Sequence, residues 1–265
     1  MYRELSGKKW RDWWQVSPAE KPDVLIVWGI FKSIKEEGYW LVTDFLLDHF
    51  KDYLKNIKPI SPHAFVGRYK GVNIAVTHAY GGAFSGDQVQ HFIKLGARLI
   101  ILLGHFGGLT KKKIPVGKIF IPTAAYRADG TSYYFMWKSR RLVKPDREVV
   151  KWLGKYLNKN KMPYVAGNIK TVSTMLGQTN SRIKKWQKEN FIGVDLESAV
   201  VFSIARVNKV KSVSILHHSD HVGGGKLLSD VSQKELKEKK KARKIIVNLA
   251  LRTAEKFGKK KKSRR

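Results

Sequence analysis

Short apolar runs alternate along the chain with segments in which apolar residues recur at helical spacing. The runs are rich in β-branched and aromatic residues, which favour strands, whereas the segments between them have the period of amphipathic helices. This alternation is typical of an α/β fold, so we expect a single domain whose central mixed, largely parallel twisted sheet is flanked by helices. The predicted strands are Val24–Trp28, Ala64–Tyr69, Val72–His78, Arg98–Leu103, Lys118–Ala125, Pro163–Val172 and Lys211–Leu216.

Helix signals lie between these runs. The segment Ser85-Gly86-Asp87-Gln88 has the spacing of a capping box, which predicts a helix that begins there and ends near Gly96. Apolar positions in the second half of the last predicted helix fall on about one face, so that half should dock on the sheet. The further helices are expected over Arg147–Asn158, from about Asp195 onward, and over Val231–Phe257.

The chain shows no internal repeat and no linker. We predict one domain over residues 23–257, a Trp-rich basic extension over 1–22, and a mobile basic tail over 258–265. Trp10, Trp13 and Trp14 lie within five residues of one another. These indoles either cover a hydrophobic groove on the domain or on a second subunit, or stack on bases or sugars.

The composition predicts a folded protein in the cytoplasm. Hydrophobic residues make up 43% of the chain, which is enough for a sizeable core, and no apolar run reaches the ~20 residues that span a bilayer. The chain contains no cysteine, which excludes disulfides and thiolate metal sites. A lysine-rich chain without cysteine also agrees with an origin in a hot habitat.

The charge is the most unusual property of the composition. The chain has 52 Lys and Arg against 21 Asp and Glu, a formal net charge of +31, whereas thermophile surfaces usually balance lysine with glutamate. Such a surplus predicts a polyanionic partner, and we expect RNA, with ribosomal RNA and ribosomal proteins as the partners. The predicted RNA-binding residues lie in basic runs and in the tail: Lys111, Lys112, Lys113, Arg140, Arg141, Lys239, Lys240, Lys241, Lys259, Lys260, Lys261, Lys262, Arg264 and Arg265.

Three segments carry candidate chemistry. Leu103–Leu109 is a strand end followed by a glycine-rich turn, which lets backbone amides approach an anion or a sugar closely. Gly193–Ala199 places Asp195 and Glu197 at a helix start, where a carboxylate can bind a diol; alternatively, Asp195 only caps the helix. The third segment places Asp220 at the end of a strand, where open α/β sheets usually meet their ligands.

Three histidines accompany Asp220 in the third segment, His217–His221. A metal site there is not favoured, because adjacent strand residues face opposite sides of a sheet and no carboxylate-rich partner segment is evident. Histidines packed beside the sheet or near a phosphate backbone are favoured instead. We expect neither a metal nor a cofactor.

Taken together and in this order, the segments resemble the nucleoside phosphorylase and nucleosidase superfamily, of the purine nucleoside, uridine and 5'-methylthioadenosine phosphorylase type. The resemblance runs from about Val24 to about Leu228 and implies the nucleoside phosphorylase fold. Relatives are usually dimers or hexamers, so oligomerisation is an expectation too. The residues that carry the resemblance are Gly107–Leu109, Val116–Ala125, Asp129–Tyr134, Gly167–Ile169, Gly193–Ala199 and Ser219–His221.

The resemblance also implies roles for individual residues. Glu197 matches the glutamate that holds the ribose 2' and 3' hydroxyls, and Asp220 matches the catalytic aspartate that protonates or hydrogen-bonds the purine ring as the glycosidic bond breaks. Leu196, Asp195 and Gly107 complete the implied nucleoside site. Met175 stands where many members place an aromatic that stacks on the purine.

The phosphate half departs from the family pattern. Where phosphorylases of this family carry a Gly-Asp-Pro-x-Arg loop, this chain has Gly29-Ile30-Phe31-Lys32-Ser33, and Leu102 replaces a second arginine. A leucine cannot replace a guanidinium that holds phosphate bidentately. Gly29, Lys32 and His105, which stands in place of a Ser or Thr, are left as a degenerate phosphate site.

Three functions follow from these observations. The first is a phosphorylase-like scaffold that acts as an RNA-binding, ribosome-associated protein with little or no catalysis. The second is an active purine nucleoside or 5'-methylthioadenosine phosphorylase whose phosphate contacts have moved to Lys32, His105 or Lys111–Lys113. The third is a nucleosidase, which uses water and needs no phosphate arginines. Base release from nucleosides with and without phosphate separates the last two functions.

Overall fold

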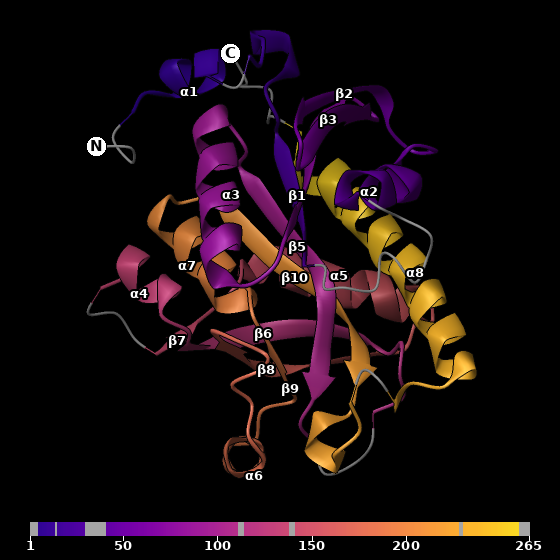
Figure 1. The fold of residues 1–265 in the computed structure, drawn as a ribbon. Coiled ribbons are helices and arrows are strands. Elements are labelled where there is room, and N and C mark those ends of the chain that lie inside the picture. Colours follow the sequence, from indigo (N-terminus) through magenta and orange to yellow (C-terminus); the bar gives the residue numbers. More distant parts are fainter. Residues whose placement is uncertain are drawn as a thin grey trace.

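A twisted sheet runs through the centre of the computed structural model, which describes residues 5–13, 15–29, 41–110, 114–137, 141–227 and 230–259 (Figure 1). Parallel pairs join β1 to β4 and β5, β10 to β5, and β8 to β6 and β9, whereas the outer pairs β2–β3 and β3–β4 are antiparallel. The strands are β1 (Val24–Gly29), β2 (Lys55–Ser61), β3 (Ala64–Tyr69), β4 (Val72–Ala79), β5 (Leu99–Gly108), β6 (Ile119–Ala128), β7 (Leu142–Val143), β8 (Tyr164–Val172), β9 (Gly193–Asp195) and β10 (Lys211–Asp220).

The strand order is β10-β6-β8-β9-β5-β1-β4-β3-β2, with β7 paired to β6. Strand β10 also pairs with β5, so β10, β6, β8, β9 and β5 form a closed ring from which the other strands extend. The ring brings the ends of β5, β9 and β10 to one place. The mixed sheet of an α/β domain, with helices on its faces, is therefore confirmed.

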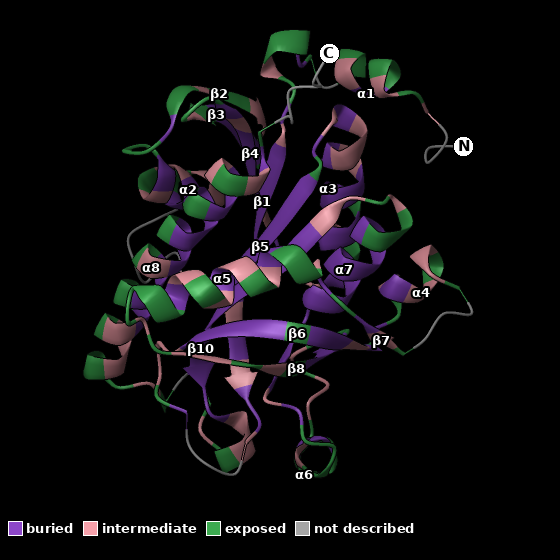
Figure 2. Ribbon diagram, turned by 180° about the vertical axis from the view of Figure 1, so that it is seen from behind, coloured by how far each residue is buried: buried purple, intermediate pink, exposed green. Residues whose placement is uncertain are grey.

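Helices cover both faces of the sheet. Helices α2 (Val42–Phe50), α5 (Arg147–Lys159) and α8 (Gln233–Phe257) pack on one face through an apolar core that includes Phe45, Leu153 and Ile246. Helices α3 (Gly82–Leu95) and α7 (Ser198–Val207) pack on the other face. The central strands are buried between these two layers of helices (Figure 2). Smaller elements are α1 (Gly7–Trp13), α4 (Thr131–Phe135), α6 (Asn180–Lys188) and the 3-10 turns η2 (Pro18–Glu20) and η4 (Val222–Gly224).

All seven predicted strands and the four predicted helices are present, with differences at their ends. Helix α3 begins at Gly82 rather than Ser85, so Ser85 lies in its first turn, and its hydroxyl donates to the Gly81 carbonyl (2.7 Å) instead of capping the helix. Helix α7 begins at Ser198, and α8 begins at Gln233 with Ser232 and Glu235 as a capping box. The second half of α8 docks on the sheet as predicted.

Helix α1 carries the tryptophan cluster. Trp10 is 3% exposed, and its ring centroid lies 5.2 Å from that of Trp13 and 4.6 Å from that of His91 on α3. The prediction that an indole covers a groove on the domain is thus confirmed for Trp10. Trp13 is 61% exposed, and Trp14 lies outside the described residues. The boundaries at residues 22 and 257 stay a prediction.

No helix in the described part of the chain is both long enough and apolar enough to cross a membrane.

Candidate active site

A pocket opens where β1, β5, β9 and β10 end. It encloses about 540 Å³ of space free of atoms, open solvent at its mouth included. Eight of the nine residues predicted from the resemblance line it, and Lys32 lies outside the described residues. The lining residues are Gly29, Tyr80, His105, Gly107, Met175, Gln178, Val194, Asp195, Leu196, Glu197, Ser219, Asp220 and Val222.

Glu197 is held in place by backbone donors. Its Oε1 accepts the N–H of Gly81 (2.8 Å), and its Oε2 accepts the N–H of Leu196 (3.3 Å). Burial raises the pKa of Glu197, and the nearby charge of Asp195 raises it further. Burial and Glu197 together also raise the pKa of Tyr80, so the phenol is neutral. The pocket therefore presents a fixed carboxyl group beside a phenol, and both can bond sugar hydroxyls.

Asp195 uses its oxygens within the protein. Its Oδ1 accepts the Thr171 hydroxyl (2.6 Å) and its Oδ2 accepts the N–H of Ser198 (3.0 Å), while Thr171 Oγ1 accepts the N–H of Ala199 (2.9 Å). These bonds tie β8 to the first turn of α7. They favour the capping interpretation of Asp195, which positions Glu197, two residues later, at the pocket.

Asp220 ends β10 and is 6% exposed. The neighbouring Ser219 hydroxyl contacts the Asp220 carboxylate and donates to the carbonyl of Phe106 (3.0 Å). Burial raises the pKa of Asp220 to about 6, against the opposing effects of Ser219 and the positive charge of Lys239. A carboxylic acid with a pKa near the working pH suits proton donation to a leaving group.

The other end of the pocket is formed by Gly29 and His105. Burial, Lys239 and Arg243 lower the pKa of His105 to about 4, so this imidazole is neutral. Within the described ranges, no lysine or arginine lines the pocket itself. Lys111, Lys112 and Lys113, offered above as replacement phosphate contacts, lie outside the described residues.

His217 and His218 lie on opposite faces of β10, as the strand alternation predicts, and His221 directly follows the strand. The ring of His217 lies 6.1 Å from that of His105, whereas the ring of His218 lies 5.2 Å from that of Phe106 and 6.1 Å from that of His221. Burial lowers the pKa of His218 to about 4 and that of His217 below its usual range. All of these rings are packed beside the sheet.

The loop that carries Met175 and Gln178 is anchored from β8. Lys170 Nζ bonds Glu189 (2.5 Å) and lies 4.4 Å from the ring centroid of Tyr126 and 4.7 Å from that of Phe191. A buried ammonium is stabilised by such ring faces as well as by the carboxylate. This arrangement ties the end of α6 to β8, so the segment that contains Met175 and Gln178 lies between two elements that are held together.

The predicted RNA-binding residues differ in exposure. Arg141, Lys240, Lys241 and Lys259 are exposed, but Lys239 is only 7% exposed because it faces the sheet from α8. Lys239 is therefore not available to a surface partner. The remaining ones, Lys111, Lys112, Lys113, Arg140, Lys260, Lys261, Lys262, Arg264 and Arg265, lie outside the described residues.

Sequence reasoning missed several residues of the site. Tyr80, Gln178 and Ser219 supply polar groups to the pocket, and Val222 supplies an apolar wall. Tyr80 and Ser219 had a usable signal, because Tyr80 directly follows β4 and Ser219 precedes Asp220 at the end of β10. Gln178 had none, since it comes from an irregular loop.

Comparison with known proteins places this geometry in a family. A family model described as the phosphorylase superfamily matches residues 42–251. The chain belongs to the phosphorylase superfamily. A DeoD-type purine nucleoside phosphorylase from Clostridium beijerinckii is 26% identical over 215 residues, which is 76% of this chain and 86% of that protein.

Solved structures agree with this assignment at the level of the fold. Uridine phosphorylase from Vibrio fischeri superimposes with a TM-score of 0.73 at 18% identity, covering 95% of each chain. The 5'-methylthioadenosine/S-adenosylhomocysteine nucleosidase from Campylobacter jejuni gives a TM-score of 0.69 at 19% identity, covering 88% of this chain and 99% of that one. The superfamily scaffold, shared by phosphorylases and nucleosidases, is therefore established for this chain.

Proposed function

We propose that the pocket binds a purine nucleoside and cleaves its N-glycosidic bond. The observation that carries the proposal is that Glu197 and Asp220, from two different elements, line the same pocket as buried carboxyl groups. These are the positions where the superfamily resemblance implies the ribose and base contacts. The similarity to purine nucleoside phosphorylases supports a purine as the base of the nucleoside. The loop that departs from the family's phosphate-binding pattern, Gly29–Ser33, contains neither Glu197 nor Asp220.

Glu197 supplies the sugar contact. The carboxyl group of Glu197, whose pKa is raised to about 8 by burial and by Asp195, can bond the 2' and 3' hydroxyls of a ribose at once, one through each oxygen. Its backbone bonds to Gly81 and Leu196 hold the group before the substrate arrives. Pre-organisation of this kind lowers the entropic cost of placing the sugar.

Asp220 supplies the proton. As the bond from the anomeric carbon to the purine breaks, its electron pair goes to the base, and the protonated carboxyl group of Asp220 transfers its proton to a ring nitrogen. The sugar is left with oxocarbenium character and is then attacked by a nucleophile. The raised pKa of Asp220, about 6, keeps a usable share of the acid form near neutral pH.

The test is release of free base from a panel of purine nucleosides, followed by chromatography. We expect release by the wild type, a loss of roughly a hundredfold or more in kcat for Asp220→Asn, and a raised KM for Glu197→Gln. Asp87→Asn is the matched control, because Asp87 is an exposed carboxylate on α3. No release by the wild type, or equal release by Asp220→Asn, would sink the proposal.

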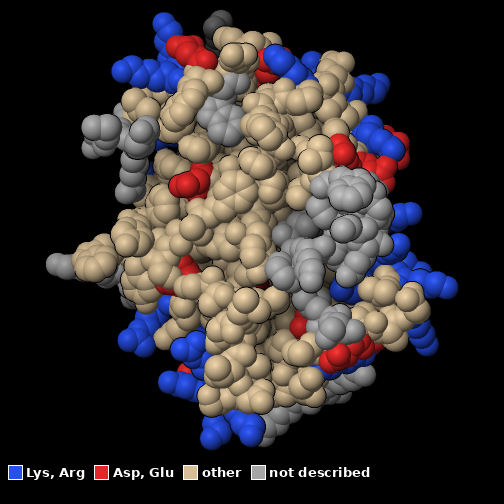
Figure 3. All heavy atoms as spheres, in the orientation of Figure 1, with Lys and Arg blue, Asp and Glu red and all other residues tan. Residues whose placement is uncertain are grey.

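RNA binding is the second candidate, and the surface of α5 favours it. Arg147, Lys151, Lys155 and Lys159 recur every four residues and are exposed, on a helix that lies across the outside of the molecule (Figure 2). Like charges at this spacing destabilise an isolated helix, and a polyanion relieves their repulsion. From Arg147 to Lys159, these four side chains span about 18 Å along the helix. On the face shown in Figure 3, lysine and arginine side chains gather toward the rim.

This candidate has its own test. The protein should sediment with ribosomal particles from cell extract at moderate salt and be released as salt rises, because contacts to phosphates release counterions. The double variant Lys151→Glu/Lys155→Glu should be released at lower salt, whereas the pocket variant Asp220→Asn should behave as the wild type. Sedimentation as a free protein at low salt would exclude this function.

A further inference from the structure

Two aromatic side chains at the end of α4 face solvent. Tyr134 is 87% exposed and Trp137 is 76% exposed, and no aromatic side chain in the described ranges is more exposed than these two. Tyr134 belongs to α4, and Trp137 follows one residue after the helix end cap. Tyrosine and tryptophan usually bury most of their area. This segment therefore presents two ring faces that the core of the domain does not use.

The backbone that carries these rings is fixed by a buried arginine. Arg127 of β6 is 1% exposed, and its guanidinium donates to the carbonyls of Ser132 (2.9 Å) and Met136 (2.8 Å). The guanidinium also lies 4.3 Å from the ring centroid of Tyr133. Asp129 accepts the N–H of Ser132 (2.6 Å). The two exposed rings thus project from a rigid support, which lowers the entropic cost of binding a ligand to them.

A row of exposed cations leads from this segment along α5. Strand β7 follows the segment and α5 follows β7, so α4, β7 and α5 succeed one another across the side of the molecule seen in Figure 2. No carboxylate in the described part of the chain forms an ion pair with any cation of this row. The carboxylate of α5 itself, Glu148, pairs with Lys211 of β10 instead. The row consists of Arg141, Lys144, Arg147, Lys151, Lys155 and Lys159.

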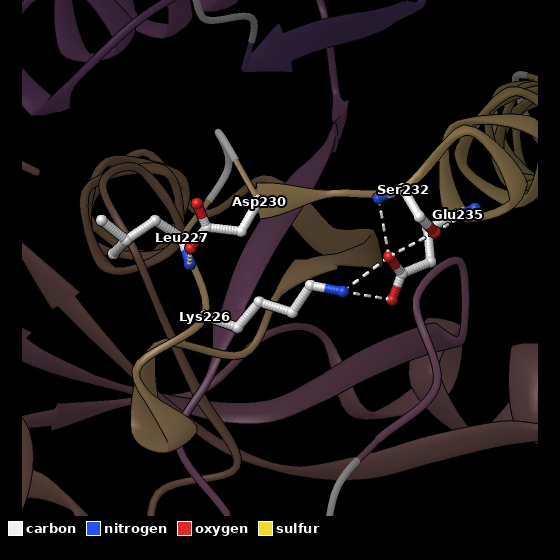
Figure 4. Close-up of polar contacts among 5 residues, drawn as sticks. All are labelled: Lys226, Leu227, Asp230, Ser232 and Glu235. Carbon is white, nitrogen blue, oxygen red and sulfur yellow. Dashed lines mark hydrogen bonds and ion pairs between the residues drawn. The ribbon is translucent and has the colours of Figure 1, made fainter.

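The start of α8, the other lysine-rich helix, differs in both respects. Lys226 Nζ bonds the two carboxylate oxygens of Glu235 at 2.7 and 2.6 Å (Figure 4), and Lys241 pairs with Glu238 at 2.8 Å. Leu227, the exposed apolar residue drawn with Glu235 in Figure 4, has no ring that could stack on a base. Glutamates thus compensate part of the charge near α8, whereas the row along α5 is uncompensated and begins beside two aromatic rings.

We propose that Tyr134 and Trp137 stack on unpaired bases of single-stranded RNA whose phosphates follow the row of cations along α5. The inference rests on the RNA-binding candidate above and names the form of the RNA and the residues that contact its bases. Aromatic side chains stack on bases of any sequence, while a positively charged track binds the backbone. A duplex keeps its bases stacked on one another and could engage only the cations. The two exposed rings beside the row are what favours a single strand.

The first test measures the affinity of the full chain for RNA by fluorescence anisotropy. The probe is labelled oligouridylate of about 15 nucleotides, and polyphosphate is the comparison polyanion without bases. Tyr134→Ala and Trp137→Ala should each weaken the affinity for oligouridylate by roughly fivefold to a hundredfold, the range for one stacked base. Both should leave the affinity for polyphosphate unchanged. Trp137→Phe, which keeps a ring, should lose much less, and Leu227→Ala is the matched exposed control.

The second test measures the salt dependence of the same binding. Lys151→Gln/Lys155→Gln should weaken the binding of both polyanions and reduce the salt slope for oligouridylate by roughly 1.4, at about 0.7 for each phosphate contact on a single strand. Tyr134→Ala and Trp137→Ala should keep the wild-type slope. Lys237→Gln/Lys240→Gln, two exposed lysines of α8, is the matched control and should keep it too.

A spectroscopic measurement reports the stacking itself. Saturating oligouridylate should quench the tryptophan fluorescence of the wild type and quench that of Trp137→Phe much less. Because Tyr134 and Trp137 are exposed, their variants should keep the wild-type Tm, which separates a loss of binding from a loss of folding.

The possible failures are distinguishable. If the wild type binds oligouridylate and Tyr134→Ala and Trp137→Ala bind it equally well, the stacking site is refuted and RNA binding stands. If the α8 pair changes the salt slope as much as the α5 pair does, the row along α5 is refuted. If the wild type binds neither oligouridylate nor ribosomal particles at low salt, the inference and the RNA-binding candidate fail together.

Discussion

The pH dependence of stability at Asp220 gives a direct check on the electrostatics of the site. The carboxyl group has a pKa of 3.8 in an unfolded chain and about 6 in the fold, because burial disfavours its charged form. The folded protein therefore binds more protons than the unfolded one between these values, and stability falls as pH rises from about 4 to about 6. Replacing Asp220 with asparagine removes this effect.

The size of the effect follows from the two pKa values. A difference of about two pH units corresponds to about 3 kcal/mol at any pH above both. Asp220→Asn should thus be more stable than the wild type by up to about 3 kcal/mol at pH 7.5, and by much less at pH 4. A residue that is needed for proton transfer would then be one that destabilises the fold at neutral pH.

The assay is equilibrium unfolding in urea for wild type and Asp220→Asn at a series of pH values and constant ionic strength. Other titrating groups are common to both proteins, so the difference between their unfolding free energies isolates Asp220. Asp87→Asn serves as the exposed control and should show a small, flat difference. A difference for Asp220→Asn that does not change with pH would refute the reasoning.

Other outcomes are expected from the same contacts. The value of kcat/KM for base release should fall as pH rises above about 6, because Asp220 loses its proton; a profile flat from pH 5 to 8 would contradict this. Lys170→Met should lower the unfolding free energy by about 1–3 kcal/mol, since it removes the ion pair with Glu189 and the ring contacts, as urea unfolding would show. Trp10→Ala should lower it by about 3–5 kcal/mol and Trp13→Ala by far less, because only Trp10 is buried; similar losses would count against this packing.

The sequence was most informative where burial dictates residue type. Strands such as Val24–Gly29 and Ala64–Tyr69 are apolar runs because they lie inside the sheet, so their positions could be predicted. Strand β2, Lys55–Ser61, was missed because it is an edge strand, partly exposed, with lysines and a proline in place of apolar residues. Edge strands tolerate these residues since one side needs no strand partner.

Helix starts and pocket residues could also be predicted only where a local sequence motif determines them. The capping-box spacing at Ser85 gave the correct helix, but the helix starts at Gly82, and Ser85 lies in its first turn with its hydroxyl bonded to the Gly81 carbonyl. Glu197 and Asp220 could be placed in one pocket from ordered motifs, whereas Gln178 enters it from a loop whose path no local pattern dictates.

Lys239 is a buried residue within a run of lysines that was predicted to be exposed. The sequence placed it with Lys240 and Lys241 as a surface residue, although it shares a helical face with Arg243, Ile246 and Ala250, all of them buried. That spacing of four, seven and eleven residues was a usable signal. A net charge of +31 is typical of solvent-exposed lysines, but it does not indicate the direction of each side chain in the run.

The central claim is that Glu197 holds the ribose of a purine nucleoside. It is tested most directly by calorimetric titration of the protein with adenosine and inosine and with their 2',3'-dideoxy analogues. We predict that the wild type binds at least one parent nucleoside roughly tenfold or more tightly than its dideoxy analogue, and that Glu197→Gln loses most of this difference. Equal affinity of the wild type for both members of each pair, or no binding of either nucleoside, would contradict the account.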